Sequence, residues 1–409
     1  MIEVRAHQSL NELDPGAMEK VNATSARASL FASPAWLGHF LAHDVDFNAQ
    51  GARPFILGAW EGGTLKGYLP LKANHNRGGR VLSSLISAEV ERPRVVAAPE
   101  DDQRVSQAFF RALLNCAEEW DLLEFYQQDE SSLLAAPTGL TDRHWFRRLS
   151  DRANNVLELP FADMTAYAAA LSSSMRYTKK RELKAILAAP GLKVSIAQNP
   201  VACTALFEVF LDVERRSWKH RAKAGVGSRE KTYRAALADP RVQTSACIAS
   251  IDGVPMGGSL WVHYGKRSYH LQTVYAESYE ALAPGTLLTC VTIADALERR
   301  QVAFDMLPDF SHYKSRWGAQ TIETHWVQIF RVGSRRHLRA VVGDFWRKIR
   351  PPAPAVGTVR TNPYRVAAGR AQASASFDKA HLDALLETAR AAGAVEQDAA
   401  TLSARKLLS

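Results

Sequence analysis

The sequence carries one local pattern twice: an apolar strand, a turn in which an acidic residue precedes glycine, and a second apolar strand. The two copies span residues 56–71 and 247–262. Their turns and later glycines align pairwise, Glu61-Gly62 with Asp252-Gly253 and Gly67 with Gly258. An acidic residue followed by glycine favours the turn that reverses an antiparallel pair. Either copy alone is consistent with an isolated hairpin, so the elements that follow decide the interpretation.

A helix and then a strand follow both copies. Residues 104–119 have helical periodicity and lead into a strand at 122–126, as residues 286–300 lead into a strand at 302–307. Because order, element type and approximate spacing recur, the sequence predicts a duplicated α/β domain. We expect the following divisions: a first domain over 1–150, a second over 155–332, a basic amphipathic helix over 333–350, and a Pro/Ala-rich linker with a helical tail over 351–409.

Composition places the chain among globular proteins. With 409 residues, 46% of them hydrophobic and 23% charged, the chain can bury the cores of two domains. It has no apolar run long enough to cross a bilayer, and its N-terminus lacks the order of a secretion signal, so we expect a soluble, cytoplasmic protein. The four cysteines lie far apart in apolar settings. This predicts buried thiols, with neither a disulfide framework nor a metal site.

The formal net charge of +9 favours anionic partners. Nucleic acid, a phosphate-bearing co-substrate and an anionic membrane surface all fit, and charge alone does not choose among them. In the helix over 333–350, the apolar residues Leu338, Val341, Val342, Phe345 and Trp346 fall on one side and basic residues on the rest. Such a helix can lie in the interface of an anionic membrane, or it can dock on the core with solvated arginines.

Residues 268–317 contain a predicted strand, a Pro-Gly turn, a long apolar helix, a buried strand and a loop rich in ionisable groups. At Pro284, Gly285 and Thr286 the chain enters the helix, where glycine lets a phosphate approach and the helix dipole favours its charge. The pyrophosphate of coenzyme A suits this turn, although Pro-Gly is also common before helices. Arg176 and Lys180 share a face of an earlier helix, where they can hold phosphates or be solvated.

The loop after the buried strand brings together Asp305, Asp309, His312, Tyr313 and Lys314. A buried carboxylate needs a partner, so we expect Asp305 to pair with Lys314 or with a substrate ammonium. Tyr313 is a fitting acid for a departing thiolate. Its alternative role is packing against Trp317.

His270 is the first candidate for a base that deprotonates an amine, because the solution pKa of histidine suits that task. Strand alternation places it on the same face as Gln272. A structural histidine on a half-exposed strand is the alternative, and Glu214, Glu277 and Asp305 are competing bases. The candidate pocket residues are Trp218, Gln272, Tyr275 and Trp317, with burial in the core as the alternative for Trp218.

Several short motifs in a fixed order resemble the GNAT acyltransferase superfamily. They are RYTKKRELKAI, RSWK, IDGVPMGG, VYAESYEALAPGTLL, AFDML and HYKSRW, and the similarity is clearest over residues 175–317. The branch that they resemble is related to the CelD protein of cellulose biosynthesis and, more distantly, to the FemAB peptide ligases. The earlier segments FASPAWLGHF and YLPL look like the N-terminal half of that branch.

This resemblance implies tandem GNAT domains of the α/β class, with mixed sheets flanked by helices. It implies that an acyl donor binds where strands splay in the second copy. The positions of this sequence that match the family's pattern are Pro284, Gly285, Asp305, Tyr313, Lys314 and Trp218. The glycine-rich pyrophosphate loop typical of the family is reduced here to ALAPGT, which is a departure from its pattern. The first copy lacks the lysine and tyrosine cluster, so we expect it to be non-catalytic or to form one wall of the pocket.

We therefore expect an N-acyltransferase that moves an acyl group from acyl-CoA, its co-substrate, to a primary amine, with no permanently bound cofactor. Bacterial ceramide synthases are similar to this branch, and the basic helix suits a sphingoid base as the amine, at the inner face of the cytoplasmic membrane. One alternative is a FemAB-like ligase that uses aminoacyl-tRNA; the sequence shows no long helical hairpin of that kind, and we do not favour a nucleic-acid partner. The other is a non-enzymatic scaffold in polysaccharide or lipid assembly.

Overall fold

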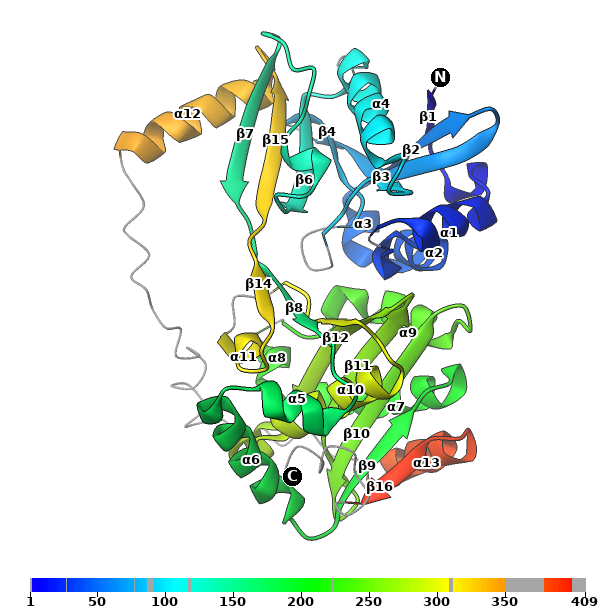
Figure 1. The fold of residues 1–409 in the computed structure, drawn as a ribbon, viewed down its shortest axis with the longest axis vertical. Helices are drawn as coiled ribbons and strands as arrows, with labels where there is room; N and C mark the ends of the chain where they lie inside the picture. The colour runs from blue at the N-terminus through cyan, green and yellow to red at the C-terminus, as the bar shows by residue number, and fades with distance from the viewer. Residues whose placement is uncertain are drawn as a thin grey trace.

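The computed structural model describes residues 2–26, 28–76, 78–86, 92–116, 119–222, 224–308, 312–349 and 379–398. They form two α/β units, one above the other in Figure 1, each built on a mixed eight-stranded sheet flanked by helices. The predicted α/β class with two mixed sheets is confirmed.

The first sheet has the order β1-β2-β3-β4-β6-β15-β7, with β5 paired to β3. Its strands are β1 (Glu3–His7), β2 (Arg53–Glu61), β3 (Thr64–Asn76), β4 (Gly79–Ser84), β5 (Val96–Ala97), β6 (Leu122–Gln128), β7 (His144–Ser150) and β15 (His325–Arg331). Its helices are α1 (Pro15–Thr24), α2 (Pro34–His43), α3 (Val45–Ala49) and α4 (Asp102–Asn115). Alternate residues of β2 face opposite layers, because Ile56 packs with α1 to α3 and Leu57 with α4.

The second sheet has the order β14-β8-β13-β12-β11-β10-β9-β16. Its strands are β8 (Asn154–Glu158), β9 (Leu192–Ala197), β10 (Gln243–Ile251), β11 (Val254–Tyr264), β12 (Arg267–Tyr275), β13 (Ala303–Asp305), β14 (Gln320–Ile322) and β16 (Val395–Asp398). Its helices are α5 (Met164–Ala170), α6 (Ser173–Leu187), α7 (Pro200–Arg215), α8 (Trp218–Arg221), α9 (Glu230–Ala238), α10 (Pro284–Glu298) and α11 (His312–Ser315). Helix α10 is buried along nearly its whole length, between the sheet and α5 and α6.

The two units exchange strands. In the first sheet β15, which follows the second unit in sequence, lies between β6 and β7. In the second sheet β8, which directly follows β7, lies between β13 and β14. The predicted boundary at residues 150–155 falls between β7 and β8, but β15, inside the predicted second domain, belongs to the first sheet. Figure 1 shows the paired segments β7–β8 and β15–β14 running together from one unit to the other.

The repeat extends to the register of the hairpins. The loop between β2 and β3 is Gly62-Gly63, and the loop between β10 and β11 is Asp252-Gly253; all four residues have positive φ, as this turn requires. Both hairpins have a bulge just before the loop. The equivalent pairs are Ala59↔Gly67 and Trp60↔Leu65 in one hairpin, and Ala249↔Gly257 and Ser250↔Pro255 in the other. Gly67 therefore corresponds to Gly257. The predicted alignment with Gly258 was wrong by one residue because Glu61 belongs to the strand and not to the loop.

Gly67 gives a stability prediction. A Cβ added there would lie 2.7 Å from Val105 Cγ1 of α4 and 2.8 Å from the Val96 carbonyl oxygen. We expect Gly67→Ala to lower the free energy of unfolding by about 1–3 kcal/mol, the usual cost of overpacking. Gly38→Ala is the matched control, because its Cβ would meet nothing within 4 Å and α2 should gain roughly 0.5–1 kcal/mol. Urea unfolding measures both, and equal stability of the two variants would contradict the packing argument.

The chain after β15 forms α12 (Arg335–Ile349) and, after residues outside the described part, α13 (Lys379–Ala391) and β16. Leu382, Leu386 and Ala389 of α13 are buried in the same core as α7, and β16 extends the second sheet at β9. Helices α12 and α13 thus lie within the segments 333–350 and 351–409 in which helices were expected, while residues 399–409 of the tail lie outside the described residues. In the part of the chain that the structure describes, no helix has both the length and the apolar character to cross a membrane.

Candidate active site

Strands β12 and β13 diverge. They are parallel and pair over only three positions, Arg267↔Ala303, Ser268↔Phe304 and Tyr269↔Asp305. β12 then continues to Tyr275 with β11 on one side, and within the described residues no strand pairs with its other edge. β13 ends at Asp305, and two residues later the chain is in the left-handed region at Leu307, where φ is 61°. An unpaired strand edge presents backbone N–H and C=O groups to whatever lies beside it.

The end of β12 faces the start of α10. A Cβ added at Gly285 would meet only the ring of Tyr275, at 3.8 Å, so the predicted residues Gly285 and Tyr275 are neighbours. Ala283 stands before the helix in the left-handed region, with φ of 52°, and no side chain in the described structure caps this terminus. The first turn of α10 therefore has backbone N–H groups without a side-chain cap from Ala283, and the predicted phosphate position there stays a prediction.

A buried lysine lies behind this turn. Lys179 of α6 is 3% exposed, and its Nζ donates to Glu182 at 2.8 Å and to the Thr286 hydroxyl at 3.2 Å. It also lies 4.7 Å from the centre of the Trp317 ring. Burial opposes ionisation of Glu182, but hydrogen bonds from Lys179 and Thr286 outweigh it and hold the pKa of Glu182 below its usual value. Lys179 thus fixes the start of α10 from inside.

Sequence reasoning selected other basic residues of this helix. The Arg176 guanidinium donates to the carbonyls of Ala169 and Leu171, and Lys180 is half-buried on α6. The hydroxyl of Thr286, a predicted cofactor-binding residue, is hydrogen-bonded to Lys179 and Glu182. The signal for Lys179 was present in the sequence as an i, i+3 pair with Glu182.

The Lys179–Glu182 pair gives a second stability prediction. Glu182→Ala removes the anion beside an ammonium that is almost fully buried. We expect the free energy of unfolding to fall by about 2 kcal/mol, less than for a fully buried pair because Glu182 is partly solvated. Lys179→Met combined with Glu182→Ala should recover part of that loss. Thermal or urea unfolding of the single and double variants measures it, and a double variant less stable than Glu182→Ala alone would contradict this reading.

Tyr313 and Trp317 support α10. The Tyr313 hydroxyl donates to the Gly285 carbonyl at 3.3 Å and shares a hydrogen bond with the Thr289 hydroxyl. Burial raises the pKa of Tyr313 well above the usual value for a phenol. Trp317 is fully buried in the apolar core, and its ring is edge-on to that of Tyr313 at 6.5 Å. The geometry matches the packing alternative for this pair.

His270 occupies a different setting from the predicted one. β12 has a bulge at Leu271, so that Trp261 pairs with His270 and Leu260 with Gln272. The bulge breaks the alternation on which the shared face with Gln272 rested. His270 Nε2 lies 3.0 Å from the Ser259 hydroxyl and 2.6 Å from the Thr273 hydroxyl. Burial, with the charges of Lys314 and Lys219, lowers the pKa of His270 to about 3, which makes it a weak proton acceptor at neutral pH.

The Gln272 side chain contacts α8 and the loop that follows it. It accepts from Lys219 Nζ at 2.6 Å and donates to the Ala224 carbonyl. Lys219 follows Trp218, which begins α8 and is half-buried. Glu214 at the end of α7 is buried and accepts from the Val226 N–H at 3.0 and 3.1 Å. Its carboxylate fixes the loop before α9.

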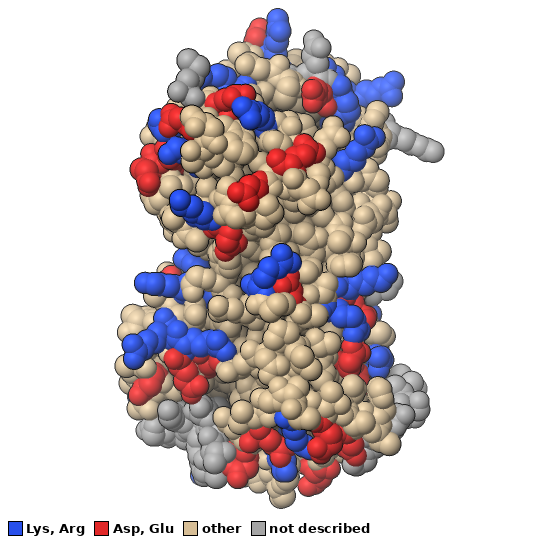
Figure 2. All heavy atoms as spheres, turned by 90° about the vertical axis from the view of Figure 1, so that its right-hand side faces the viewer, with Lys and Arg blue, Asp and Glu red and all other residues tan. Residues whose placement is uncertain are grey.

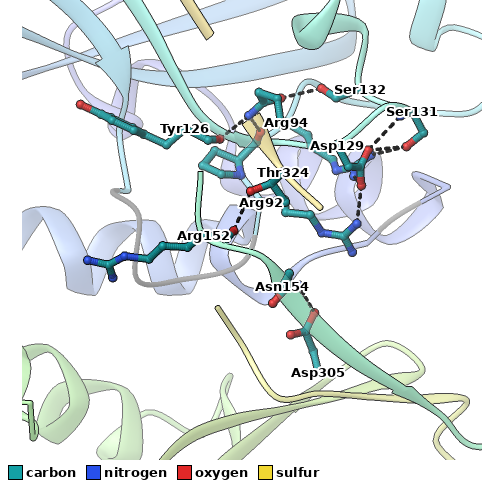
Figure 3. A network of polar contacts seen from close by, with 12 residues as sticks. Arg92, Arg94, Tyr126, Asp129, Ser131, Ser132, Arg152, Asn154, Asp305 and Thr324 are labelled. Carbon is teal, nitrogen blue, oxygen red and sulfur yellow. Dashed lines mark hydrogen bonds and ion pairs between the residues drawn. The ribbon is translucent and has the colours of Figure 1, made fainter. Parts of the chain in front are cut away.

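Asp305 lies at the junction of the two units (Figure 3). It is fully buried and accepts from the Leu307 N–H at 2.8 Å and from Asn154 Nδ2 at 3.1 Å. Lys314 Nζ donates to the Leu307 carbonyl at 2.7 Å, so Asp305 and Lys314 bond to the two backbone groups of Leu307, and their predicted direct pairing stays a prediction. Burial raises the pKa of Asp305 above its usual range, against the opposing charge of Arg92.

Arg92 reaches this junction from the first unit. In the first sheet the strand equivalent to β12 is interrupted, because β4 and β5 both pair with β3 but are separated by residues 85–95. Arg92 and Arg94 belong to that interruption, and both donate to Asp129. Two polar atoms here, Arg92 Nε and Asn154 Oδ1, are buried with no partner in the described structure. Buried polar atoms of this kind are the ones that a ligand or water satisfies.

Asp309 lies outside the described residues, and so does the side chain of His312, although the backbone of His312 begins α11. Among the described residues, no group of three or more His, Cys, Asp or Glu side chains is placed to hold a metal ion. Cys203, Cys247 and Cys290 are buried thiols as predicted, while Cys116 is only partly buried.

A cavity of about 360 Å³ lies between the units, on the α2 and α3 side of the first sheet. It lies beside Ser83 and Glu124, where β4 and β6 are parallel and pair over three positions, as β12 and β13 do. Arg229 and Tyr233 of the second unit close it. Burial lowers the pKa of Lys72 in this cavity despite the nearby Asp44 and Glu124. No local sequence pattern predicted this cavity, because its walls come from segments that are distant in the sequence.

Comparisons with known proteins agree with this architecture. Residues 173–315, from the start of α6 to the end of α11, match the family model described as acetyltransferase (GNAT) domain. FemX shares the fold with a TM-score of 0.54 and 9% identity, over 80% of this chain and 96% of that one. A conserved protein of unknown function from Bacteroides thetaiotaomicron has a TM-score of 0.50 and 11% identity, over 81% of this chain and 100% of that one.

A tandem GNAT protein from the clavulanic acid biosynthesis pathway is also similar, with a TM-score of 0.43 and 12% identity, over 81% of this chain and 99% of that one. A search of curated proteins finds no match.

Proposed function

We propose that this protein is an acyl-CoA-dependent N-acyltransferase whose reaction takes place where β12 and β13 diverge. The observation that carries the proposal is this divergence: past Tyr269, among the described residues, no strand pairs with one edge of β12, and the end of β12 lies beside the start of α10. The pantetheine arm of acyl-CoA would lie along that edge, with its pyrophosphate at the first turn of α10. The acetyltransferase family match over the same residues supports the assignment.

The acceptor in this proposal is a primary amine that enters at the junction of the units. A substrate ammonium there would face the Asp305 carboxylate and the unpartnered Asn154 Oδ1. Asp305 takes one proton, because its raised pKa makes it a better acceptor than His270. The amine nitrogen then bonds to the thioester carbon, the carbon–sulfur bond breaks, and the second proton lost by the nitrogen goes to the departing thiolate, which leaves as free coenzyme A.

Lys314 has an electrostatic role in this mechanism. Its ammonium lowers the pKa of His270, so its positive charge is felt at the edge of β12. A charge in that position stabilises the oxyanion that forms on the thioester carbonyl. His270, Tyr313 and Lys179 act as positioning residues, since each holds backbone or side chains of β12 or α10.

We propose a sphingoid base as the specific amine. Support comes from the resemblance to the branch that includes bacterial ceramide synthases and from the apolar, basic helix α12. A FemAB-like ligase that uses aminoacyl-tRNA is the second candidate, because FemX has the same fold over most of both chains. Figure 2 shows basic and acidic side chains interspersed on one face of the molecule, so that face offers no continuous basic track for RNA.

Release of free coenzyme A tests the proposed activity. With long-chain acyl-CoA and sphinganine, we expect thiol to appear only when both substrates are present, and mass spectrometry should find the N-acylated amine. Thiol release with other primary amines but not with sphinganine would keep the acyltransferase and reject the sphingoid base. No release with any acyl-CoA and amine, together with transfer from aminoacyl-tRNA, would reject the acyl-CoA assignment.

Gly285→Asp tests the pyrophosphate position. A carboxylate in the first turn of α10 should leave the fold intact, since Cβ fits there and acidic residues stabilise helix starts by about 0.3–1 kcal/mol. It should also repel the pyrophosphate, and we expect the Kd of coenzyme A to rise on the order of tenfold to a hundredfold. Calorimetric titration measures it, with Gly285→Ala as the neutral control. Equal affinities for coenzyme A in the two variants would contradict the position.

A further inference from the structure

Helix α12 is docked on the first sheet by one face only. His337 packs edge-on against the Trp145 ring at 5.4 Å, and Ala340 packs against the small apolar cluster around Phe330. Asp344 forms an ion pair with Arg147 at 3.0 Å. These three residues recur at i, i+3 and i+7, so they define a single helical face that points to the sheet.

The opposite face of α12 is apolar and exposed. It consists of Leu338, Val341, Val342, Phe345 and Trp346, which are between 43% and 60% exposed. The residues fall at i, i+3, i+4, i+7 and i+8, which is the spacing of a continuous stripe. Figure 1 shows α12 extending away from the first sheet. A contiguous stripe with two aromatic residues is unusual on a surface that only faces water.

Charge identifies the partner. Arg335 and Arg339 are exposed and lie beside the stripe at the helical positions that flank Trp346. The chain that follows, residues 350–378, is also basic, since its arginines are Arg350, Arg360, Arg365 and Arg370 and its one acidic residue is Asp378. An anionic surface attracts both basic segments electrostatically.

We infer that the face formed by Leu338, Val341, Val342, Phe345 and Trp346 inserts into the interface of an anionic lipid bilayer. The apolar stripe would lie at the boundary of headgroups and acyl chains, with Arg335 and Arg339 at the level of the phosphates. This places the first unit, through α12, on the membrane. The inference stands apart from the acyl transfer, because vesicle binding and thiol release are measured separately and either can fail alone.

Co-sedimentation of the full chain with vesicles tests the inference. We expect binding to equimolar phosphatidylglycerol and phosphatidylcholine that weakens with salt, and little binding to phosphatidylcholine alone. Leu338→Ser and the double variant Phe345→Ser/Trp346→Ser should weaken binding about tenfold or more, since each removes buried apolar surface. Arg335→Glu/Arg339→Glu should weaken it further, at roughly fivefold for each arginine lost. Val201→Ser is the control, because Val201 is 64% exposed on α7, away from this face.

Three outcomes would overturn the inference. Wild-type protein that stays in the supernatant with anionic vesicles is the first. Equal binding of Phe345→Ser/Trp346→Ser and Val201→Ser is the second. The third is a wild-type dimer in light scattering that this double variant converts to a monomer, because the face would then be covered by a second copy of the chain.

Discussion

Asp305→Asn should lower kcat by about 10²–10⁴-fold, the range by which a positioned proton acceptor accelerates a reaction. The amide oxygen can still accept the Leu307 N–H, so the turn after β13 should persist. The Kd of coenzyme A should be unchanged, because Asp305 lies at the junction of the units and not at the start of α10. Steady-state kinetics with saturating acyl-CoA, and calorimetric titration of coenzyme A, measure the two quantities.

The pH profile separates a proton acceptor from a structural carboxyl. Because the pKa of Asp305 is raised by burial, the activity of the wild type should fall on the acid side at a pH above the usual carboxyl range, and Asp305→Asn should lack that limb. The linked effect on stability has the opposite direction. The folded state binds the proton more tightly than the unfolded state, so this group's contribution is present at low pH and is lost as pH rises through the folded pKa.

Asp295→Asn is the control for both measurements. Asp295 is also a buried carboxylate, but it lies in the second half of α10. It accepts hydrogen bonds from the side chains of Trp261 and Arg299. The Asp295→Asn substitution should lower the free energy of unfolding. It should leave kcat and the fall of activity on the acid side of the pH profile unchanged. An Asp305→Asn variant with wild-type kcat and the same acid limb would exclude Asp305 as the proton acceptor.

Lys314→Met should lower kcat by about 10²–10³-fold, the usual effect of removing one group that stabilises an oxyanion. Lys314 is 8% exposed, and methionine can fill much of the same space without the charge. The loss should fall on kcat and not on the affinity for coenzyme A, because the charge acts on the transition state. Single-turnover rates and coenzyme A titration measure this split.

Lys193→Met is the matched control for the lysine, because Lys193 is half-exposed and paired with Glu396 on β16, at the far edge of the second sheet. It should leave both quantities unchanged. If Lys314→Met loses coenzyme A affinity and keeps kcat, then Lys314 is a binding residue and the oxyanion role is wrong.

Much of the fold was predictable because local patterns determined it. The acidic-Gly hairpins, the Pro-Gly helix start and the buried strand before Asp305 each lie within a short window, and each is an element of the structure. The place of β15 in the first sheet was not predictable in this way. A strand that pairs in the other unit's sheet has the same alternation of apolar and polar residues as one that pairs in its own. Tertiary pairing therefore decides which sheet it joins.

The site was only partly predictable for the same reason. Gly285 lies near Tyr275 because α10 follows β12 after a short connection, so the end of the strand and the start of the helix are close in the sequence. The place of His270 depends on a bulge at Leu271 that strand alternation does not reveal. Arg92 is far from Asp305 in sequence, and its arrival at the junction depends on an interruption in the other unit. Contacts between units carry no local pattern, and these contacts complete the site.

A crystal structure with coenzyme A bound tests the central claim most directly. The account predicts the pantetheine arm beside residues 270–275 of β12, with its thiol toward Asp305 and Lys314 and its pyrophosphate at Gly285. Coenzyme A bound instead in the cavity beside Lys72 and Glu124, with the edge of β12 covered by the protein itself, would contradict it.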